Sequence, residues 1–166
     1  MKKLIIALLL ALPLGVFAQN LKVGYLNKQE ILTAMPESNV AMKALEDMNL
    51  KYITEGKKLQ EEFQRKYQEY AEQAETMDDA IRKYKENELA RLQQSIQEFT
   101  QNAEETLKKK QQELFAPIMA KLDEAIGKVG NEQGFTYIID NTAGILTYKS
   151  AQAIDVSSAV RKALGI

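Results

Sequence analysis

An apolar stripe runs through the middle of this chain with a period slightly longer than 3.6 residues. Its steps of three and four average close to a repeat of about 11 residues, which keeps packed helices nearly straight. In the first half the stripe reads Ala41, Leu45, Met48, Tyr52, Gly56, Leu59, Phe63, Tyr67, Tyr70, Ala74, Met77 and Ile81. In the second half it reads Leu92, Ile96, Phe99, Ala103, Leu107, Lys110, Leu114, Ile118, Leu122, Ala125 and Val129. The pattern predicts long helices that pack along one face and keep the other face in water.

The stretch that carries the stripe, from about 40 to 130, is rich in strong helix formers and has no strand signal. A hairpin would bury each half of the stripe against the other. We expect the fold-back near 76–79, where Thr and Asp side chains can cap a new helix. Each arm would be about 55 Å long. Gly56 and Pro117 interrupt the arms and are predicted flex points, with a kink at Pro117.

The first 18 residues have the pattern of a secretory signal peptide. Lys2 and Lys3 precede an unbroken apolar run, and small residues precede an expected cleavage after Ala18. The run is shorter than the roughly 20 residues that a membrane-spanning helix needs. The sequence therefore favours export with removal of 1–18 over a membrane anchor.

Composition argues against most kinds of catalysis. The chain has no Cys, no His and no Trp, so the commonest general base, metal ligand and thiol nucleophile are all missing. Asp140 ends an apolar segment, but the Asp-Asn-Thr-Ala-Gly context favours a turn residue over a catalytic carboxylate. A net charge of -1 and the lack of a basic patch argue against nucleic acid. We predict no catalytic, cofactor-binding or metal-binding residue.

Short strand signals lie at both ends of the chain. Residues 21–27 alternate as in a strand, and 28–35 form a short helix that Pro36 ends, after which Ser38 or Asn39 can cap the first arm. The segments 135–140 and 145–148 are predicted to form a β-hairpin around a turn at 141–144, followed by a final helix that Asp155 caps. A sheet of this size is marginal alone, so we expect several copies of the chain to share their strands.

These elements define the expected organisation of an α+β protein. The arms, 40–117, form a long antiparallel, coiled-coil-like helical hairpin with its tip near 76–79. Residues 19–39 and 118–166 form a small β body that carries the hairpin.

A second set of apolar residues lies beside the main stripe, at the base of the arms. The arms thus carry two apolar faces along the same segment, and the partner arm can cover only one of them. The other face is expected to contact either a neighbouring subunit or a bound protein. Met suits a wall that receives varied partners. The predicted client-contacting or subunit-contacting residues are Met42, Leu50, Ile53, Phe115 and Met119.

The order of these segments resembles the Skp/OmpH family of periplasmic chaperones. The residues that carry the resemblance are Leu21 to Leu26 with Met35-Pro36, the tip at 76–79, Gln111 to Ile118, Gly134 to Asp140 and Ile154 to Ser157. The resemblance implies a jellyfish-shaped homotrimer in the periplasm. Three helical arms would hang from a shared β body around a cavity that holds unfolded outer-membrane proteins without ATP.

Two expectations complete this interpretation. The best-known members of the family are strongly basic, whereas this chain is slightly acidic, so binding to anionic lipid or lipopolysaccharide is doubtful. The leading hypothesis is an ATP-independent holdase that prevents aggregation of unfolded outer-membrane proteins. The alternative is a structural coiled-coil envelope protein or adaptor whose arms grip one folded partner.

Overall fold

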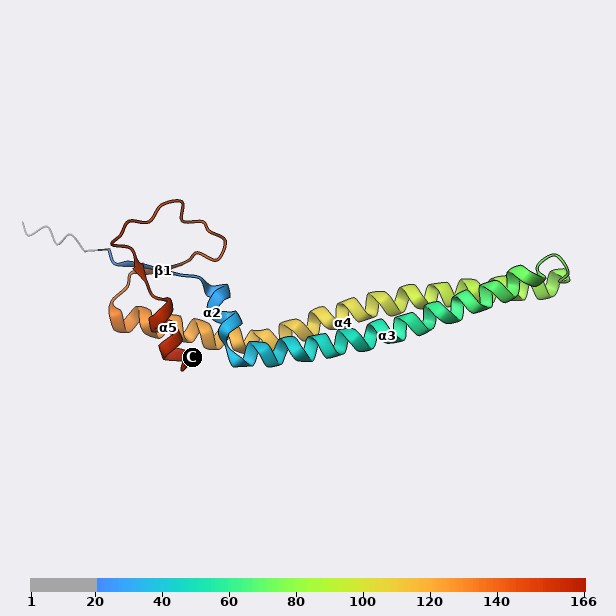
Figure 1. Cartoon of the computed structure of the whole chain (residues 1–166), viewed down its shortest axis with the longest axis horizontal. Helices are drawn as coiled ribbons and strands as arrows, with labels where there is room; N and C mark the ends of the chain where they lie inside the picture. The colour runs from blue at the N-terminus through green and yellow to red at the C-terminus, as the bar shows by residue number, and fades with distance from the viewer. Residues whose placement is uncertain (1–20) are drawn as a thin grey trace, which may run out of the picture.

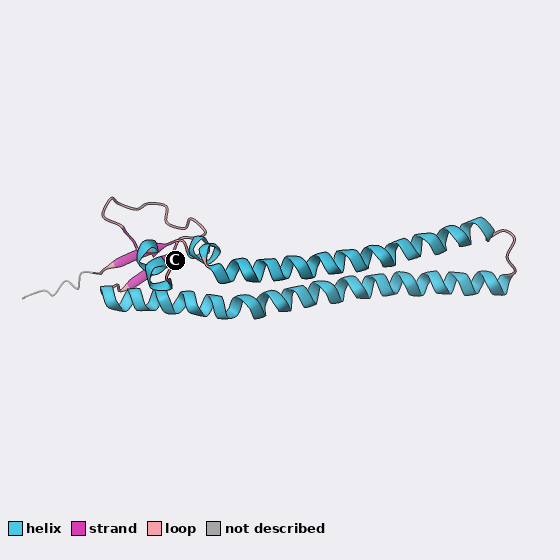
Figure 2. Ribbon diagram, turned by 60° about the horizontal axis from the view of Figure 1, so that its bottom comes forward, coloured by secondary structure: helices cyan, strands magenta, loops and turns pink. Residues whose placement is uncertain are grey.

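The computed structural model describes residues 21–166 and consists of a long helical hairpin with a small sheet at one end (Figure 1). The hairpin is formed by α3, Pro36–Gln73, and α4, Asp79–Gln133, which run side by side along their length in both views (Figure 2). The expectation of an antiparallel α-helical hairpin on a small β body is confirmed. The predicted signal peptide lies outside the described residues.

The connection between the arms is short and spans residues 74–78. Asp78 caps α4, because its carboxylate accepts hydrogen bonds from the backbone N–H groups of Ala80 at 2.9 Å and Ile81 at 3.0 Å. At the other end of α4, Gly134 adopts a left-handed conformation with φ of 66°, and the N–H of Phe135 bonds to Gly130 O. The helix therefore ends at a glycine, as the glycines of this segment lead one to expect.

The apolar stripe forms the seam between α3 and α4 along most of the hairpin. The predicted positions from Leu92 to Val129 are buried or half-buried, including Lys110. Near the tip the prediction is wrong at two positions, because Tyr67 and Ile81 are exposed and their neighbours Lys66 and Arg82 are half-buried instead. Near the tip, the contact between α3 and α4 is therefore partly polar. The spacing of apolar residues in the sequence does not show this.

The sheet has three parallel strands in the order β2-β1-β3. The central strand β1 is Val23–Leu26, and its neighbours are β2, Tyr137–Asp140, and β3, Ile154–Asp155. Strands from the two ends of the chain do meet, but the predicted β-hairpin is wrong. Residues 145–148 form no strand, and β3 instead follows a long loop that returns to the other edge of β1. Both edges of β1 are paired in this way, and the outer edge of β2, where the predicted hairpin strand would lie, has no partner within the described residues.

The hydrophobic core lies where the sheet meets the base of the hairpin. Its buried side chains come mainly from β1 and from the helices, and Leu122 on α4 has no exposed surface. Replacing a buried Leu by Ala typically costs about 2–5 kcal/mol, so this junction holds the hairpin to the body. The core is closed by α5, Ser157–Leu164, whose Ala159, Val160 and Leu164 pack into it or against it.

The start of the first arm differs from the prediction. The short helix α2, Lys28–Ala34, precedes Met35, and Pro36 is the first residue of α3. Proline fits this position because the first turn needs no intrahelical N–H bond. Neither Ser38 nor Asn39 is the cap, since both lie inside the helix, and Ser38 is buried. Likewise α4 continues through Pro117, which lies on its exposed side.

Candidate functional site

The five apolar residues singled out beside the stripe fall into two groups. Met42, Phe115 and Met119 line one cavity of about 430 Å³ at the base of the hairpin, which we call the base cavity. Leu50 and Ile53 lie farther along α3 and are more than half exposed. Met42 and Ile53 are about three helical turns apart, so they share one side of α3.

The base cavity is built by three helices. The side chains of Met42 and Leu45 come from α3, those of Phe115 and Met119 come from α4, and α2 closes one end. Sequence reasoning missed several of its residues, because they are polar or belong to the short helix. These are Gln29, Leu32, Thr33, Ser38 and Gln111.

Ser38 is the most unusual residue of the base cavity. It is 1% exposed, and its Oγ has no hydrogen-bond partner among the described residues. Buried polar groups are nearly always hydrogen-bonded, because an unpaired one loses its contact with water without compensation. Thr33 differs, since its hydroxyl donates to Gln29 O at 2.8 Å.

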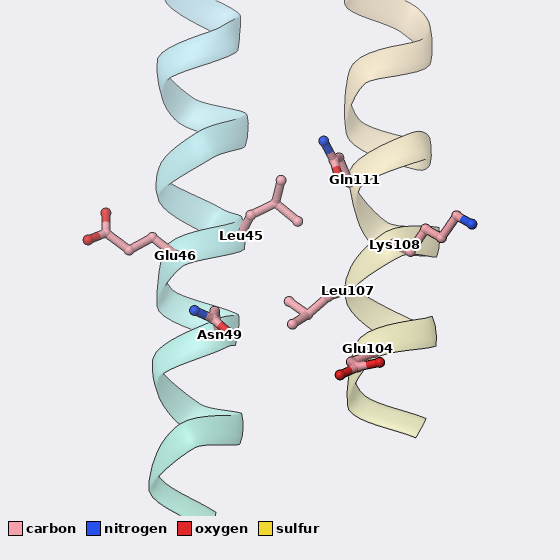
Figure 3. A pocket seen from close by; sticks show the side chains of 7 residues that line it. All are labelled: Leu45, Glu46, Asn49, Glu104, Leu107, Lys108 and Gln111. Atoms are coloured by element: carbon pink, nitrogen blue, oxygen red, sulfur yellow. The ribbon is translucent and has the colours of Figure 1, made fainter. Parts of the chain in front are cut away.

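A second hollow of about 530 Å³ continues along the same side of the hairpin (Figure 3). It shares Leu45 and Gln111 with the base cavity, so the two hollows adjoin. In Figure 3, Leu45 and Leu107 point toward each other between the arms, whereas Lys108 points away. We call the two hollows together the base groove. Glu46, Glu104 and Lys108 line the second hollow, whereas the base cavity has no charged residue in its lining among those that the structure describes.

The opposite side of the hairpin carries a separate apolar groove of about 420 Å³. Val40, Ala44 and Pro117 line it, and the ion pair between Lys121 and Glu37 lies at its edge. Hydrogen bonding to Lys121 holds the pKa of Glu37 below its ordinary value. Among the described residues, no polar side chain in the lining of this groove is both buried and without a hydrogen-bond partner.

The two predicted flex points differ in their surroundings. Gly56 faces Phe99, and a Cβ atom added to it would lie 3.5 Å from the Phe99 ring. The same ring packs edge-on against Tyr52, with ring centroids 6.0 Å apart. Pro117 has no such neighbour and lies on the exposed side of α4.

Polar contacts hold the outer part of the hairpin together. Lys66 on α3 pairs with Glu88 on α4, and the Tyr70 hydroxyl donates to Glu86 at 2.8 Å. The hydrogen bond from Lys66 lowers the pKa of Glu88, and the same bond raises the pKa of Lys66. The buried residues of the seam all lie between Ala103 and the body, so the arms are held less firmly toward the tip.

Asp140 has a structural role at the end of β2. Its Oδ1 accepts hydrogen bonds from the N–H of Lys28 at 3.2 Å, the N–H of Thr142 at 2.9 Å and the Thr142 hydroxyl at 2.6 Å. Burial raises the pKa of Asp140, but these hydrogen bonds outweigh it, so the pKa lies below its ordinary value. The carboxylate ties the turn after β2 to the start of α2.

Within residues 21–166, no group of three or more acidic, Cys or His residues is placed to hold a metal ion. None of the helices described is both long and apolar enough to cross a bilayer.

Large apolar side chains are also exposed around the sheet. Tyr148 is 82% exposed, and Tyr137 and Ile145 are each more than half exposed. They lie on β2 and on the loop that leads to β3. Within the described chain, β2 and β3 each pair on one side only, since β1 lies between them. Unpaired strand edges and exposed aromatic residues are typical of surfaces that another chain covers.

Comparison with known proteins gives consistent matches. Residues 22–164 match the sequence model of the family described as outer membrane protein (OmpH-like). A relative named chaperone protein Skp, from Yersinia enterocolitica, is 27% identical over 145 residues, which cover 86% of this chain and 88% of the relative. A crystal structure of a candidate outer membrane chaperone (OmpH-like) from Caulobacter crescentus CB15 superposes with a TM-score of 0.70 at 14% identity. The match covers 86% of this chain and 82% of the other, and it shows a shared fold.

Proposed function

The chain belongs to the OmpH-like family, and from this we propose that it is an ATP-independent holdase for unfolded outer-membrane proteins. The observation that carries the proposal is the base groove. It gives the base of the hairpin an apolar surface that the partner arm does not cover. An unfolded chain would be held there by many weak contacts rather than in one specific pocket.

Such binding slows aggregation by mass action. A protein that binds the unfolded state lowers its free concentration, and no nucleotide is needed for this effect. Met42 and Met119 suit this task, because flexible thioether side chains can repack around different sequences. Leu50 and Ile53 would extend the contact along α3 toward the tip.

We propose further that the working form is a homotrimer whose arms surround a cavity. The exposed aromatic residues around β2 and the singly paired strand edges support association through the sheet. Sedimentation equilibrium at micromolar concentration tests this, and a stable monomer would refute it. We place the protein in the periplasm, with the signal peptide cleaved after Ala18, which mass spectrometry of the exported chain can check.

The decisive assay dilutes an unfolded outer-membrane barrel into buffer and follows light scattering. The mature protein should suppress the rise in scattering without ATP. If scattering is unchanged at a several-fold excess of the protein, the holdase proposal fails. A structural adaptor, the second candidate, would leave scattering unchanged and would bind one folded envelope protein instead.

A further inference from the structure

The unpaired hydroxyl of Ser38 lies in a helix turn where Ala would serve the fold better. Ala has the higher helix propensity, and it would remove a buried polar group that lacks a partner. Ser38 is not a helix cap, and its side chain makes no hydrogen bond with the described residues. Groups of this kind are expected where a bound molecule supplies the missing partner.

The walls around Ser38 indicate what that molecule is. The base cavity is lined by Met42, Met119 and Phe115, together with Leu32. Thioether sulfur atoms make favourable contacts with aromatic ring edges, and aromatic rings pair edge to face. Gln29, Thr33 and Gln111 complete the lining, and the Thr33 hydroxyl already donates to Gln29 O. A mainly apolar cavity with one unpaired hydroxyl in its wall matches a flat ring that carries a polar tip.

We propose that the base cavity binds a tyrosine side chain of an unfolded β-barrel segment, with its phenol hydroxyl hydrogen-bonded to Ser38 Oγ. This inference rests on the proposed holdase function. Transmembrane barrels carry girdles of aromatic residues at both membrane interfaces, so their unfolded strands present tyrosine repeatedly. Ser38 Oγ is shielded from solvent. Binding of the phenol hydroxyl therefore requires a neighbouring side chain of the cavity to move aside, and Met42, which is 43% exposed, is the one we expect to do so.

The inference also assigns a division of labour along the arms. The base cavity would select an aromatic anchor, whereas Leu50 and Ile53 would contact the neighbouring side chains of the same segment without selecting among them. Aromatic side chains make good anchors because they bury a large area with few rotatable bonds.

Binding of three extended peptides to the full mature protein tests the proposal. The peptides carry the alternating sequence of a barrel strand and differ at one position, which is Tyr, Phe or Leu. Fluorescence anisotropy gives their affinities. One hydrogen bond predicts that the Tyr peptide binds about 2-fold to 10-fold more tightly than the Phe peptide. Ser38→Ala should remove this preference and leave the affinity of the Phe peptide unchanged.

Two controls keep the test sharp. Val40→Ala, in the groove on the opposite side, should leave all three affinities unchanged. Phe115→Leu should weaken the Tyr and Phe peptides alike. Equal affinities of the Tyr and Phe peptides for the unmodified protein would overturn the inference. They would indicate that a water molecule is the hydrogen-bond partner of the Ser38 hydroxyl. So would a Ser38→Ala variant that weakens both peptides equally.

The outcomes also separate this inference from the proposed function. If the protein suppresses barrel aggregation but does not distinguish Tyr from Phe, the tyrosine site is refuted and the holdase function stands. If it binds none of the peptides and leaves aggregation unchanged, both are refuted.

Discussion

Replacing Gly56 by Ala is expected to stabilise the hairpin and to weaken chaperone activity at the same time. Gly56 is half-buried in the interior of α3, opposite Phe99. An added Cβ would lie 3.5 Å from the Phe99 ring, which is an ordinary van der Waals contact and requires no displacement. The backbone at this position is helical, so Ala introduces no strain.

The magnitude follows from helix propensity. Gly in a helix interior costs about 1 kcal/mol relative to Ala, and the free energy of unfolding should rise by about this amount. In a chain of this size the midpoint of thermal unfolding should rise by about 2–4 °C. If the arm bends at Gly56 when it holds a client, the bent form becomes less favourable by about 1 kcal/mol. About 5-fold more protein should then be needed for the same suppression of aggregation.

Gly127→Ala provides a matched control. Gly127 also lies inside a long helix, and an added Cβ has no atom within 4 Å. Urea unfolding at equal protein concentration should give similar gains for both variants, and the light-scattering assay should show reduced activity only for Gly56→Ala. If Gly56→Ala loses stability while Gly127→Ala gains it, the arms lie closer together than described. If both gain stability and keep full activity, bending at Gly56 is not part of the mechanism.

Three other predictions follow from the structure. Leu122→Ala should lower the free energy of unfolding by about 2–5 kcal/mol in urea titration, because it leaves a cavity in the core that joins hairpin and body. A decrease of less than about 1 kcal/mol would show that Leu122 does not pack in that core as described. In the outer hairpin, the protection of backbone amides against hydrogen exchange, corrected for the intrinsic exchange rate at each pH, should fall as the pH drops below the ordinary pKa of Glu88. The stabilising charge on Glu88 is present above that ordinary pKa and is lost as the pH falls through the lowered value in the folded protein. The double variant Lys66→Leu with Glu88→Leu should abolish this part of the pH dependence, and an unchanged profile would show that the pair does not hold the arms. Ile53→Asp should reduce holding of an unfolded barrel in the light-scattering assay, whereas Lys109→Asp should not, and equal effects would argue against a directed surface.

The sequence was sufficient to predict the hairpin because one physical signal repeats over many turns. An inward position recurs at intervals of three and four residues, so the predicted seam from Leu92 to Val129 is the observed one. The signal weakened near the tip, where Lys66 and Arg82 replace the exposed Tyr67 and Ile81 in the seam. Whether Lys66 is half-buried depends on the charge that the facing helix places beside it. The periodicity of one helix carries no information about that facing residue.

The sheet was harder to predict, since its pairing depends on segments far apart in the chain. The apolar content of 145–148 favoured a strand, but β1 takes Ile154–Asp155 as its second neighbour. Strand propensity measures how a side chain fits a sheet and does not specify which strand is its partner. The two-residue length of β3 left no periodicity to detect.

The candidate site was predicted in part. Met42, Phe115 and Met119 were identified because apolar residues beside a filled seam have no partner within the hairpin, and the structure brings these three together. Leu50 and Ile53 lie outside the base cavity and remain predicted contacts. Ser38 or Asn39 was the predicted helix cap, because both residue types favour caps. The burial of Ser38 depends on the packing of α2 against the arms, which the sequence does not show.

The central claim is that an unfolded barrel is held against one side of the hairpin base. Photo-crosslinking from single positions tests it most directly, with the crosslinker placed at Met42, Leu50 or Ile53 and, as a control, at Lys109 on the exposed surface of α4. The account predicts strong crosslinks to an unfolded outer-membrane barrel from the first three positions and weak ones from Lys109. Equal crosslinking from all four positions, or crosslinks from Lys109 alone while aggregation is still suppressed, would contradict it.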